Sequence, residues 1–193
     1  CLSAPESVVD EFADDARAMA SEDILTWESR RISFLHESFF DYAFARRFAS
    51  RGQELLTFLR SSEQHLFRRA QVRQILIHQR EEDFDAYLEN LRELLNSSDI
   101  RFHLIIVIIA LLATYNNPQE EEWEIIKELM CSQNPLVQEV WVIFKTSIHW
   151  FQLLDSLGII EQWLQDENES HIDKTVTLLS FMQKQFPGRV AEL

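Results

Sequence analysis

Histidine, cysteine and serine are the residues of this chain that could carry chemistry, and their spacing excludes several kinds of active site. His36-Glu37 begins like the zinc-protease motif His-Glu-x-x-His, but Phe40 stands where the second zinc-binding histidine is needed. Cys1 and Cys131 lie far apart with no Cys-x-x-Cys motif, which argues against a disulfide framework or a zinc site and fits a reducing cytoplasm. No nucleophile elbow surrounds a serine, and three glycines are too few for a glycine-rich phosphate loop. We therefore expect neither catalysis nor a metal site in this chain.

One segment, Phe34 to Tyr42, carries a specific pattern of residues, Phe-Leu-His-Glu-Ser-Phe-Phe-Asp-Tyr. It resembles the Phe-x-His-x-Ser-Phe-x-Glu-Tyr signature at the end of the winged-helix domain in NACHT-type STAND ATPases, which are related to NOD-like receptors and bacterial antiphage proteins. In that family the signature closes the wing and opens the next helix. His36 occupies the histidine position, and the other matching positions are Phe34, Ser38, Phe39, Asp41 and Tyr42, with Asp41 in place of the usual Glu.

The resemblance implies a role for His36 and a setting for the whole chain. The family histidine contacts the β-phosphate of bound ADP and holds the ATPase closed. An imidazole donor can hydrogen-bond a phosphate oxygen and lose that contact when the domain swings away. The chain would then be the regulatory middle of a larger cytoplasmic ATPase that uses ADP, ATP and Mg²⁺. Its partners would be the intramolecular NACHT ATPase core, a protein ligand of the sensor region and, on activation, further copies of the parent protein in a homo-oligomer.

Positive charge is concentrated in the arginines between residues 46 and 80, which are Arg46, Arg47, Arg51, Arg60, Arg68, Arg69, Arg73 and Arg80. A winged helix followed by a basic stretch is compatible with DNA binding. We favour a solvated face that pairs with the abundant carboxylates, because aromatic interleaving is sparse and the rest of the chain is acidic. Docking on an acidic surface of the ATPase core would be another use of this charge. The formal charge of -14 disfavours unassisted binding to nucleic acid or an anionic membrane.

Acidic and aromatic residues stand out in the second half of the chain. Glu120-Glu121-Glu122 starts a predicted helix opened by Pro118, where the helix dipole favours acidic groups, so we assign these residues to capping. Aromatic residues on a helical array usually pack between repeats, but any that face outward would make a protein-binding patch. The candidates for such a patch are Trp123, Trp141, Trp150 and Trp163.

The elements that must position these residues are expected to be mainly helical. A chain of 193 residues can bury a real core, and three glycines with four prolines are too few for the tight turns of an all-β fold. The longest apolar run, Leu104 to Ala113, has about half the roughly 20 residues that a helix needs to cross a bilayer. We therefore interpret it as a buried core helix and predict no membrane association.

The first part of the chain shows a mixed pattern. Residues 3–6, Ser-Ala-Pro-Glu, have the form of a capping box for a helix with apolar positions from residue 8 to residue 19. Two short β-prone runs, 24–27 and 32–35, flank a polar tetrapeptide and predict a small hairpin. A helix should follow from about His36. This order matches the C-terminal part of a winged helix, whose preceding helices are not among these residues.

From Gly52 onward only helical periodicity is present. Similar polar turns begin at Ser97, Ser132 and Glu169, spaced by 35 and 37 residues, which is typical of the paired helices of HEAT-like repeats. In the apolar helix, Ile105, Ile108, Ile109 and Leu112 should be buried between neighbouring helices. The predicted helices span residues 53–60, 63–80, 83–96, 100–115, 118–131, 135–155, 158–166 and 170–186.

Taken together, the sequence predicts a mainly α chain with two regions. Residues 1–50 form a partial winged helix with a small β-hairpin, and residues 51–193 form a HEAT-like α-solenoid. The resemblance implies a regulatory segment that transmits ligand sensing to an ADP/ATP switch in immune or antiphage signalling. The alternative is a plain α-solenoid scaffold that binds a partner protein, and a winged-helix DNA binder is less favoured. A Gly-x-x-x-x-Gly-Lys-Ser/Thr loop encoded upstream of Cys1 would distinguish the switch from the scaffold.

Overall fold

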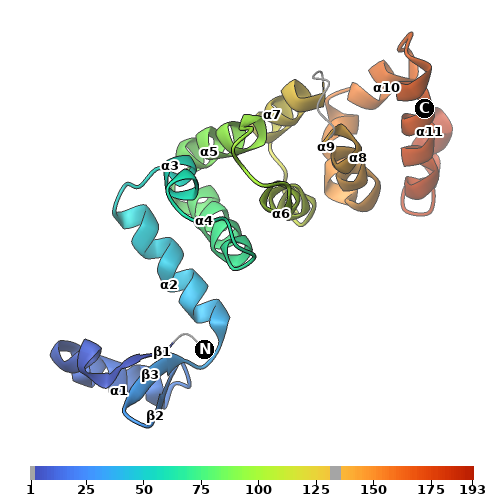
Figure 1. Ribbon diagram of the computed structural model, residues 1–193. Helices are drawn as coiled ribbons and strands as arrows, with labels where there is room; N and C mark the ends of the chain where they lie inside the picture. Colours follow the sequence, from blue (N-terminus) through green and yellow to red (C-terminus); the bar gives the residue numbers. More distant parts are fainter. Residues whose placement is uncertain (1–2, 131–135) are drawn as a thin grey trace.

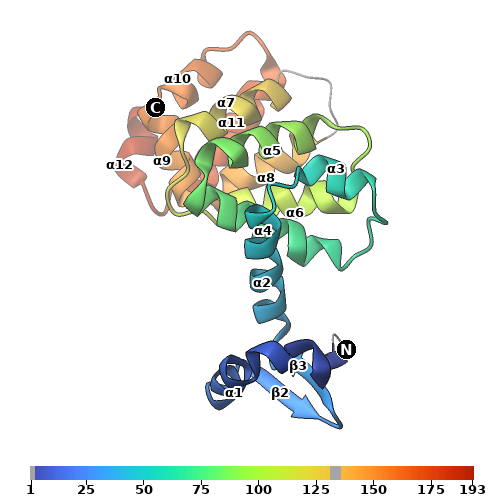
Figure 2. The ribbon, with the colours of Figure 1, turned by 90° about the vertical axis from the view of Figure 1, so that its left-hand side faces the viewer.

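The chain folds mainly as helices and carries one small antiparallel sheet (Figure 1). The computed structural model describes residues 3–130 and 136–193. Residues 3–34 form a sheet lobe, and residues 55–193 contain a helical array. The long helix α2 (Glu37–Ser50) connects the two and stands as a stalk between them in Figure 2. Along these described ranges, no helix has the length and apolarity to cross a membrane.

The sheet confirms the predicted hairpin with its strands displaced by one residue. Strands β2 (Leu25–Glu28) and β3 (Arg31–Phe34) pair antiparallel, with Trp27 opposite Ile32. Both residues of the connecting turn, Ser29 and Arg30, have positive φ angles of 53° and 60°. Two left-handed residues in a two-residue turn match the right-handed twist of the strands, as in type I′ hairpins.

The predicted capping box at the start of the chain is wrong, because Ser3–Pro5 forms strand β1 on the other edge of β3. The sheet order is therefore β1-β3-β2. The Ser3 hydroxyl accepts a hydrogen bond from Arg31 Nε at 2.8 Å instead of capping a helix. A 3₁₀ segment, η1 (Glu6–Phe12), follows, and α1 (Ala13–Ser21) completes the lobe. Pairing with β3 satisfies backbone groups that an isolated N-terminus would leave to water.

The helices of the array lie in two rows (Figure 1). Helices α3, α5 and α7 contact one another in sequence along one row, and α4, α6, α8 and α11 do so along the other. This stacking of helix pairs is what a solenoid requires, since each pair buries its apolar face only against its neighbours. The helices are α3 (Leu55–Arg60), α4 (Arg68–Glu82), α5 (Phe84–Asn96), α6 (Phe102–Ala113), α7 (Glu120–Met130), α8 (Val137–Thr146), α9 (Ile148–Ser156), α10 (Ile159–Leu164), α11 (Glu169–Met182) and α12 (Pro187–Glu192).

The helix pattern differs from prediction in several places. Helix α4 begins at Arg68 instead of residue 63, α11 ends at Met182 instead of residue 186, and α12 was not predicted. The helix expected over 135–155 is broken at Ser147, which takes an extended conformation and accepts a hydrogen bond on its side chain from the Trp150 amide at 3.5 Å. Serine caps helices well because its hydroxyl satisfies an amide in the first turn. Glu169, expected in a turn, begins α11 behind the capping residue Asn168. The turn predicted at 132–135 lies outside the described residues.

The apolar helix α6 lies at the centre of the array, as predicted. Ile105, Ile108, Ile109 and Leu112 are buried, and they belong to a core that extends from Ala45 to Met182. The sheet lobe has a separate and much smaller core of Ala16, Leu25 and Ile32. Ala45 and Phe48, in the second half of α2, belong to the array core, whereas the start of α2 adjoins the lobe. The division of the chain at residue 50 stays a prediction.

Candidate functional site

The predicted signature lies where β3 ends and α2 begins. Leu35 extends the strand pairing by donating its amide to the Ile24 carbonyl oxygen at 2.9 Å. His36 then takes an extended conformation and caps α2 through its backbone alone. Its side chain is exposed and forms no hydrogen bond within the described residues, and its ring centroid lies 5.9 Å from that of Phe39. The fold thus presents an imidazole whose nitrogen atoms are free to bind a ligand.

Of the other signature residues, Phe34 is the last residue of β3, and the rest follow His36 in the first two turns of α2. Ser38 and Tyr42 are exposed, and the Arg46 guanidinium lies 5.9 Å from the centroid of the Tyr42 ring. Asp41 is half-buried, and burial together with the nearby Glu37 carboxylate raises the pKa of Asp41 above its ordinary value. His36 can donate one hydrogen bond to a ligand here, and the amides at the start of a helix have no intrahelical partner. The carboxylates of Glu37 and Asp41 lie beside them in the first turns of α2.

Five phenylalanines connect the signature to the array, and we name them the phenylalanine seam. The Phe34 ring of β3 lies 6.2 Å from Phe40, which lies 6.2 Å from Phe44. Phe44 and Phe48 lie 5.9 Å and 5.4 Å from Phe58 of α3. Residues four apart stack on one side of a helix, and tilted or edge-on aromatic contacts add stability beyond area burial. The seam connects the end of β3 to the first helices of the array.

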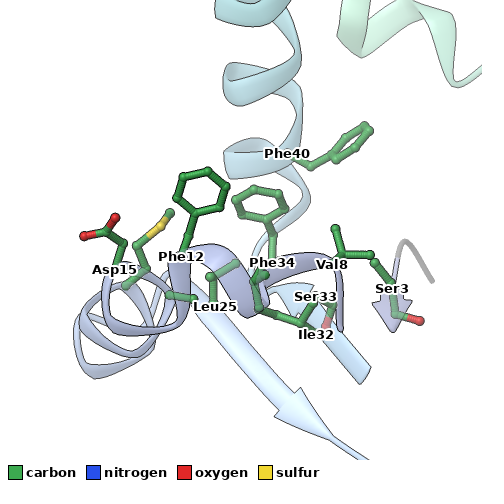
Figure 3. A pocket seen from close by; sticks show the side chains of 13 residues that line it. Ser3, Val8, Phe12, Asp15, Leu25, Ile32, Ser33, Phe34 and Phe40 are labelled. Carbon is green, nitrogen blue, oxygen red and sulfur yellow. The ribbon is translucent and has the colours of Figure 1, made fainter. Parts of the chain in front are cut away.

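Two grooves meet at Phe40. The first, of about 530 Å³, opens on the sheet lobe and is lined mainly by apolar side chains (Figure 3). Figure 3 shows Phe12, Phe34 and Phe40 among the side chains that line it, and Phe40 comes from α2. The second, of about 540 Å³, lies between α2 and the loop before α4, and its lining includes Leu66 and Phe67. We call the second one the α2–α4 groove. Both grooves adjoin the predicted signature.

A buried ionic cluster that sequence reasoning missed lies on the array side. Glu122 is fully buried, and its Oε1 accepts hydrogen bonds from Arg80 Nε at 2.7 Å and from the Tyr87 hydroxyl at 2.6 Å. Its Oε2 accepts from Arg80 Nη2 at 3.0 Å and from the Gln119 amide at 2.8 Å. The Arg80 guanidinium also lies 4.0 Å from the centroid of the Tyr115 ring. Capping therefore describes only part of the role of Glu122.

The cluster joins three helices through one carboxylate. Burial, followed by the Glu122 charge, raises the pKa of Tyr87, which keeps its hydroxyl protonated as a donor. Two donors from Arg80 offset the cost of burying the carboxylate. The sequence contains a signal for this position, because Glu122 lies four and seven residues before the buried Ile126 and Leu129 and so shares their face of α7. The sequence contains no comparable signal for its partners Arg80 and Tyr87, which lie on other helices.

All four candidate tryptophans are buried, as expected of aromatic residues that pack between repeats, so none of them forms the exposed protein-binding patch that was the alternative. The ring centroids of Trp141 and Trp163 are 4.8 Å apart, and those of Trp123 and Trp163 are 5.7 Å apart. Trp150 Nε1 donates to the Leu112 carbonyl oxygen at 2.8 Å. These large rings fill the space between α6, α7, α8, α9 and α10, where the apolar area they bury stabilises the array.

The arginines of residues 46–80 pair with carboxylates less than predicted. Arg60 lies 2.8 Å from Asp99, and Arg80 binds Glu122. Arg68 lies over the Phe58 ring at 4.6 Å and donates to the Gln71 side-chain oxygen at 2.6 Å. Within the described ranges, no carboxylate lies within ion-pair distance of the other basic side chains of this stretch, Arg46, Arg47, Arg51, Arg69 and Arg73.

Comparison with protein-family models, with curated proteins and with solved structures finds no match to this chain. The resemblance of the Phe34–Tyr42 segment to NACHT-type ATPases therefore stays a prediction. In the part of the chain that the structure describes, no three His, Cys, Asp or Glu side chains are grouped as metal ligands would be.

Proposed function

We propose that this chain is a regulatory, sensor-coupling segment of a STAND-type ATPase, as the Phe34–Tyr42 resemblance implies. The observation that carries the proposal is the exposed, unpartnered side chain of His36 at the β3–α2 junction. In the parent protein this imidazole would donate a hydrogen bond to a phosphate oxygen of ADP held by the NACHT core. The core would bind ATP together with Mg²⁺. A bound ADP would supply the negative charge that the positive end of α2 favours.

The phenylalanine seam supports the coupling part of the proposal. A displacement of the array, where a sensor would be engaged, would reach the β3–α2 junction through the packed rings between Phe58 and Phe34. Packed aromatic contacts transmit such displacements because protein interiors have low compressibility. His36 would then move away from the phosphate, and the closed state would open for assembly into a homo-oligomer. Immune or antiphage signalling is the setting that the resemblance implies, and the chain itself would hydrolyse no ATP.

The substitution His36→Ala in the parent protein tests this proposal. Loss of one hydrogen bond to a charged phosphate should cost about 1.5 to 3 kcal/mol, so bound ADP should decrease and resting activity should rise roughly tenfold or more. Nucleotide content after purification and basal signalling measure the two effects. His149→Ala, on α9, is the matched control. ADP content and resting activity equal to those of the wild type would rule out the assigned role of His36.

A second candidate function is a helical scaffold that binds a partner protein. The exposed Leu66 and Phe67 beside the α2–α4 groove favour it. The coding sequence upstream of Cys1 separates the two candidates, since a Gly-x-x-x-x-Gly-Lys-Ser/Thr loop there would support the ATPase switch. Absence of that loop would favour the scaffold.

A further inference from the structure

Two neighbouring apolar side chains project from the loop between α3 and α4. Leu66 is 64% exposed and Phe67 is 84% exposed. Single exposed apolar residues are common, but adjacent large ones beside a groove are typical of interaction sites. Both residues line the α2–α4 groove, which Phe40 closes on the α2 side.

The structure holds this loop in place. The buried side chain of Gln64 donates to the Asp99 carbonyl oxygen at 2.9 Å and accepts from the Arg101 amide at 2.7 Å. The Arg68 and Arg69 amides donate to the carbonyl oxygens of the preceding turn at 3.0 Å and 3.1 Å. Phe67 is therefore presented by an ordered backbone, so little conformational entropy would be lost when it binds.

The charge around the loop is opposite to that of the rest of the molecule. Residues 46–80 contain eight of the 18 basic residues and two of the 32 acidic residues, a net charge of +6, so the remaining residues have a net charge of -20. Arg69 and Arg73 lie four residues apart on α4, on one side of the helix. Both are exposed, and neither has a carboxylate partner among the described residues. Although the chain is rich in carboxylates, the guanidinium groups of Arg69 and Arg73 remain available to bind a partner.

We infer that Leu66, Phe67, Arg69 and Arg73, which we call the α4 docking face, bind an acidic protein surface that presents an apolar side chain. The apolar side chain would pack on Leu66 and Phe67, and the partner's carboxylates would lie toward Arg69 and Arg73. Glu37 and Asp41 line the opposite, α2 wall of the groove. They repel a carboxylate there and so fix the orientation of the partner. This inference does not depend on the proposed nucleotide switch.

A protein partner fits this face better than a nucleic acid does. Nucleic-acid affinity comes largely from many phosphate contacts with a broad basic surface, whereas this face has two free arginines beside a wall that carries two carboxylates. The net charge of the rest of the chain would also repel a polyanion that extends beyond the face.

A displayed library of random peptides, selected on the immobilised 193-residue chain, tests the inference without nucleotide. We expect the enriched peptides to be acidic and to contain an aromatic or aliphatic residue. Each enriched peptide, synthesised with a fluorophore, is then titrated by fluorescence anisotropy against the wild type, Phe67→Ser and the double variant Arg69→Glu/Arg73→Glu. Both variants should weaken binding by about tenfold or more, as expected for the centre of an interface.

The matched controls lie on the far part of the array. Phe181→Ser removes another exposed aromatic residue, and Lys184→Glu reverses another exposed charge, so both should bind as the wild type does. Circular dichroism confirms that every variant is folded. Failure to enrich any peptide, enrichment of basic or uncharged peptides, or equal binding by the docking-face variants and controls would overturn the inference. It would also be overturned by micromolar binding of a short DNA duplex that the double variant abolishes, which would identify a nucleic-acid surface.

Discussion

Glu122 is a fully buried carboxylate that accepts four hydrogen bonds inside the array. Its burial is tolerated because Arg80 supplies the opposite charge and Tyr87 and the Gln119 amide occupy the remaining lone pairs. The same donors would be left unsatisfied in the interior if the carboxylate were removed, and that loss costs more than the net value of the pair.

Truncation of this residue should be strongly destabilising. We expect Glu122→Ala to lower the free energy of unfolding by about 3 to 5 kcal/mol, because the half-buried Arg80 charge loses its carboxylate and the Tyr87 hydroxyl and Gln119 amide lose their acceptor. The double variant Arg80→Met/Glu122→Leu should lose less than this single variant, since it leaves no unpaired charge. Urea denaturation followed by circular dichroism measures both. Glu121→Ala, at the exposed neighbouring position, is the control, and an equal effect of Glu121→Ala and Glu122→Ala would contradict the role of the cluster.

Tyr115 should make the free energy of unfolding depend on pH in the alkaline range. Burial raises the pKa of Tyr115 to about 12, whereas an unfolded tyrosine titrates near pH 10. The folded state thus disfavours loss of the proton. The resulting stabilisation is present below about pH 10 and is lost toward pH 12, by up to about 1.4 kcal/mol per pH unit.

The variant Tyr115→Phe should lose less stability than the wild type as the pH rises toward 12. At pH 7 it should be nearly neutral, because the buried Tyr115 hydroxyl has no hydrogen-bond partner of ordinary geometry among the described residues. Urea midpoints between about pH 8 and pH 11.5 measure the slope, and some dependence should remain because the pKa of Tyr87 is also raised. A slope identical to that of the wild type would show that Tyr115 does not titrate as proposed.

At this scale, the sequence predicted local roles better than contacts between distant residues. The acidic run at 120–122 correctly predicted a helix start, and the 3.6-residue period could have shown that Glu122 shares the face of Ile126. Its partners Arg80 and Tyr87, 42 and 35 residues away, depend on how α4, α5 and α7 stack. The exposure of His36 could not be predicted from the sequence pattern either, because it depends on how the lobe and the array are placed around the β3–α2 junction.

Elements whose ends are set by local chemistry were predicted well, and those set by distant pairing were not. The hairpin of β2 and β3 follows from β-prone runs around a polar turn. Strand β1 forms only because β3 offers it an edge 28 residues away, so Ser3 and Pro5 suggested a helix start instead. The break at Ser147 illustrates a local signal that the apolar period of the surrounding helix obscured.

Helix α2 should hold the lobe and the array in one arrangement through the phenylalanine seam. Phe44→Ala removes the ring that touches Phe40, Phe48 and Phe58, so we expect the lobe to sample a wider range of positions. Spin labels at the exposed positions Asp10 and Glu93, in a variant without native cysteines, report this as a broader distance distribution by electron–electron double resonance. Phe181→Ala is the control. An unchanged distribution of spin-label distances would show that the phenylalanine seam does not fix the position of the lobe relative to the array.

On the scale of the whole molecule, stability is concentrated in the array. Over residues 3–34, the lobe buries three apolar side chains, whereas the array has one continuous core. A small core gives little surface burial to offset chain entropy. The lobe is therefore expected to open more readily than the array, as regions with few buried apolar contacts do.

A charge in the centre of the array should disrupt several helix pairs together. Ile109 of α6 is buried, so Ile109→Asp would place an unpaired carboxylate in the core at a cost of several kcal/mol, a large share of typical stability. The helical circular-dichroism signal should melt at a much lower temperature, because stacked repeats stabilise one another. Val142→Asp, at an exposed position of α8, is the control. A melt of Ile109→Asp that overlays the wild-type curve would argue against α6 as the shared core.

The placement of the tryptophans gives the two parts of the molecule separate optical reporters. Trp27 lies on β2 against the lobe core, and the other four of the five tryptophans lie in the array core. Trp123, Trp141 and Trp163 are near enough to exchange excitation energy, so they should emit as a coupled group. Replacement of Trp27 by phenylalanine would leave the emission of the array alone, and the difference spectrum would follow the lobe.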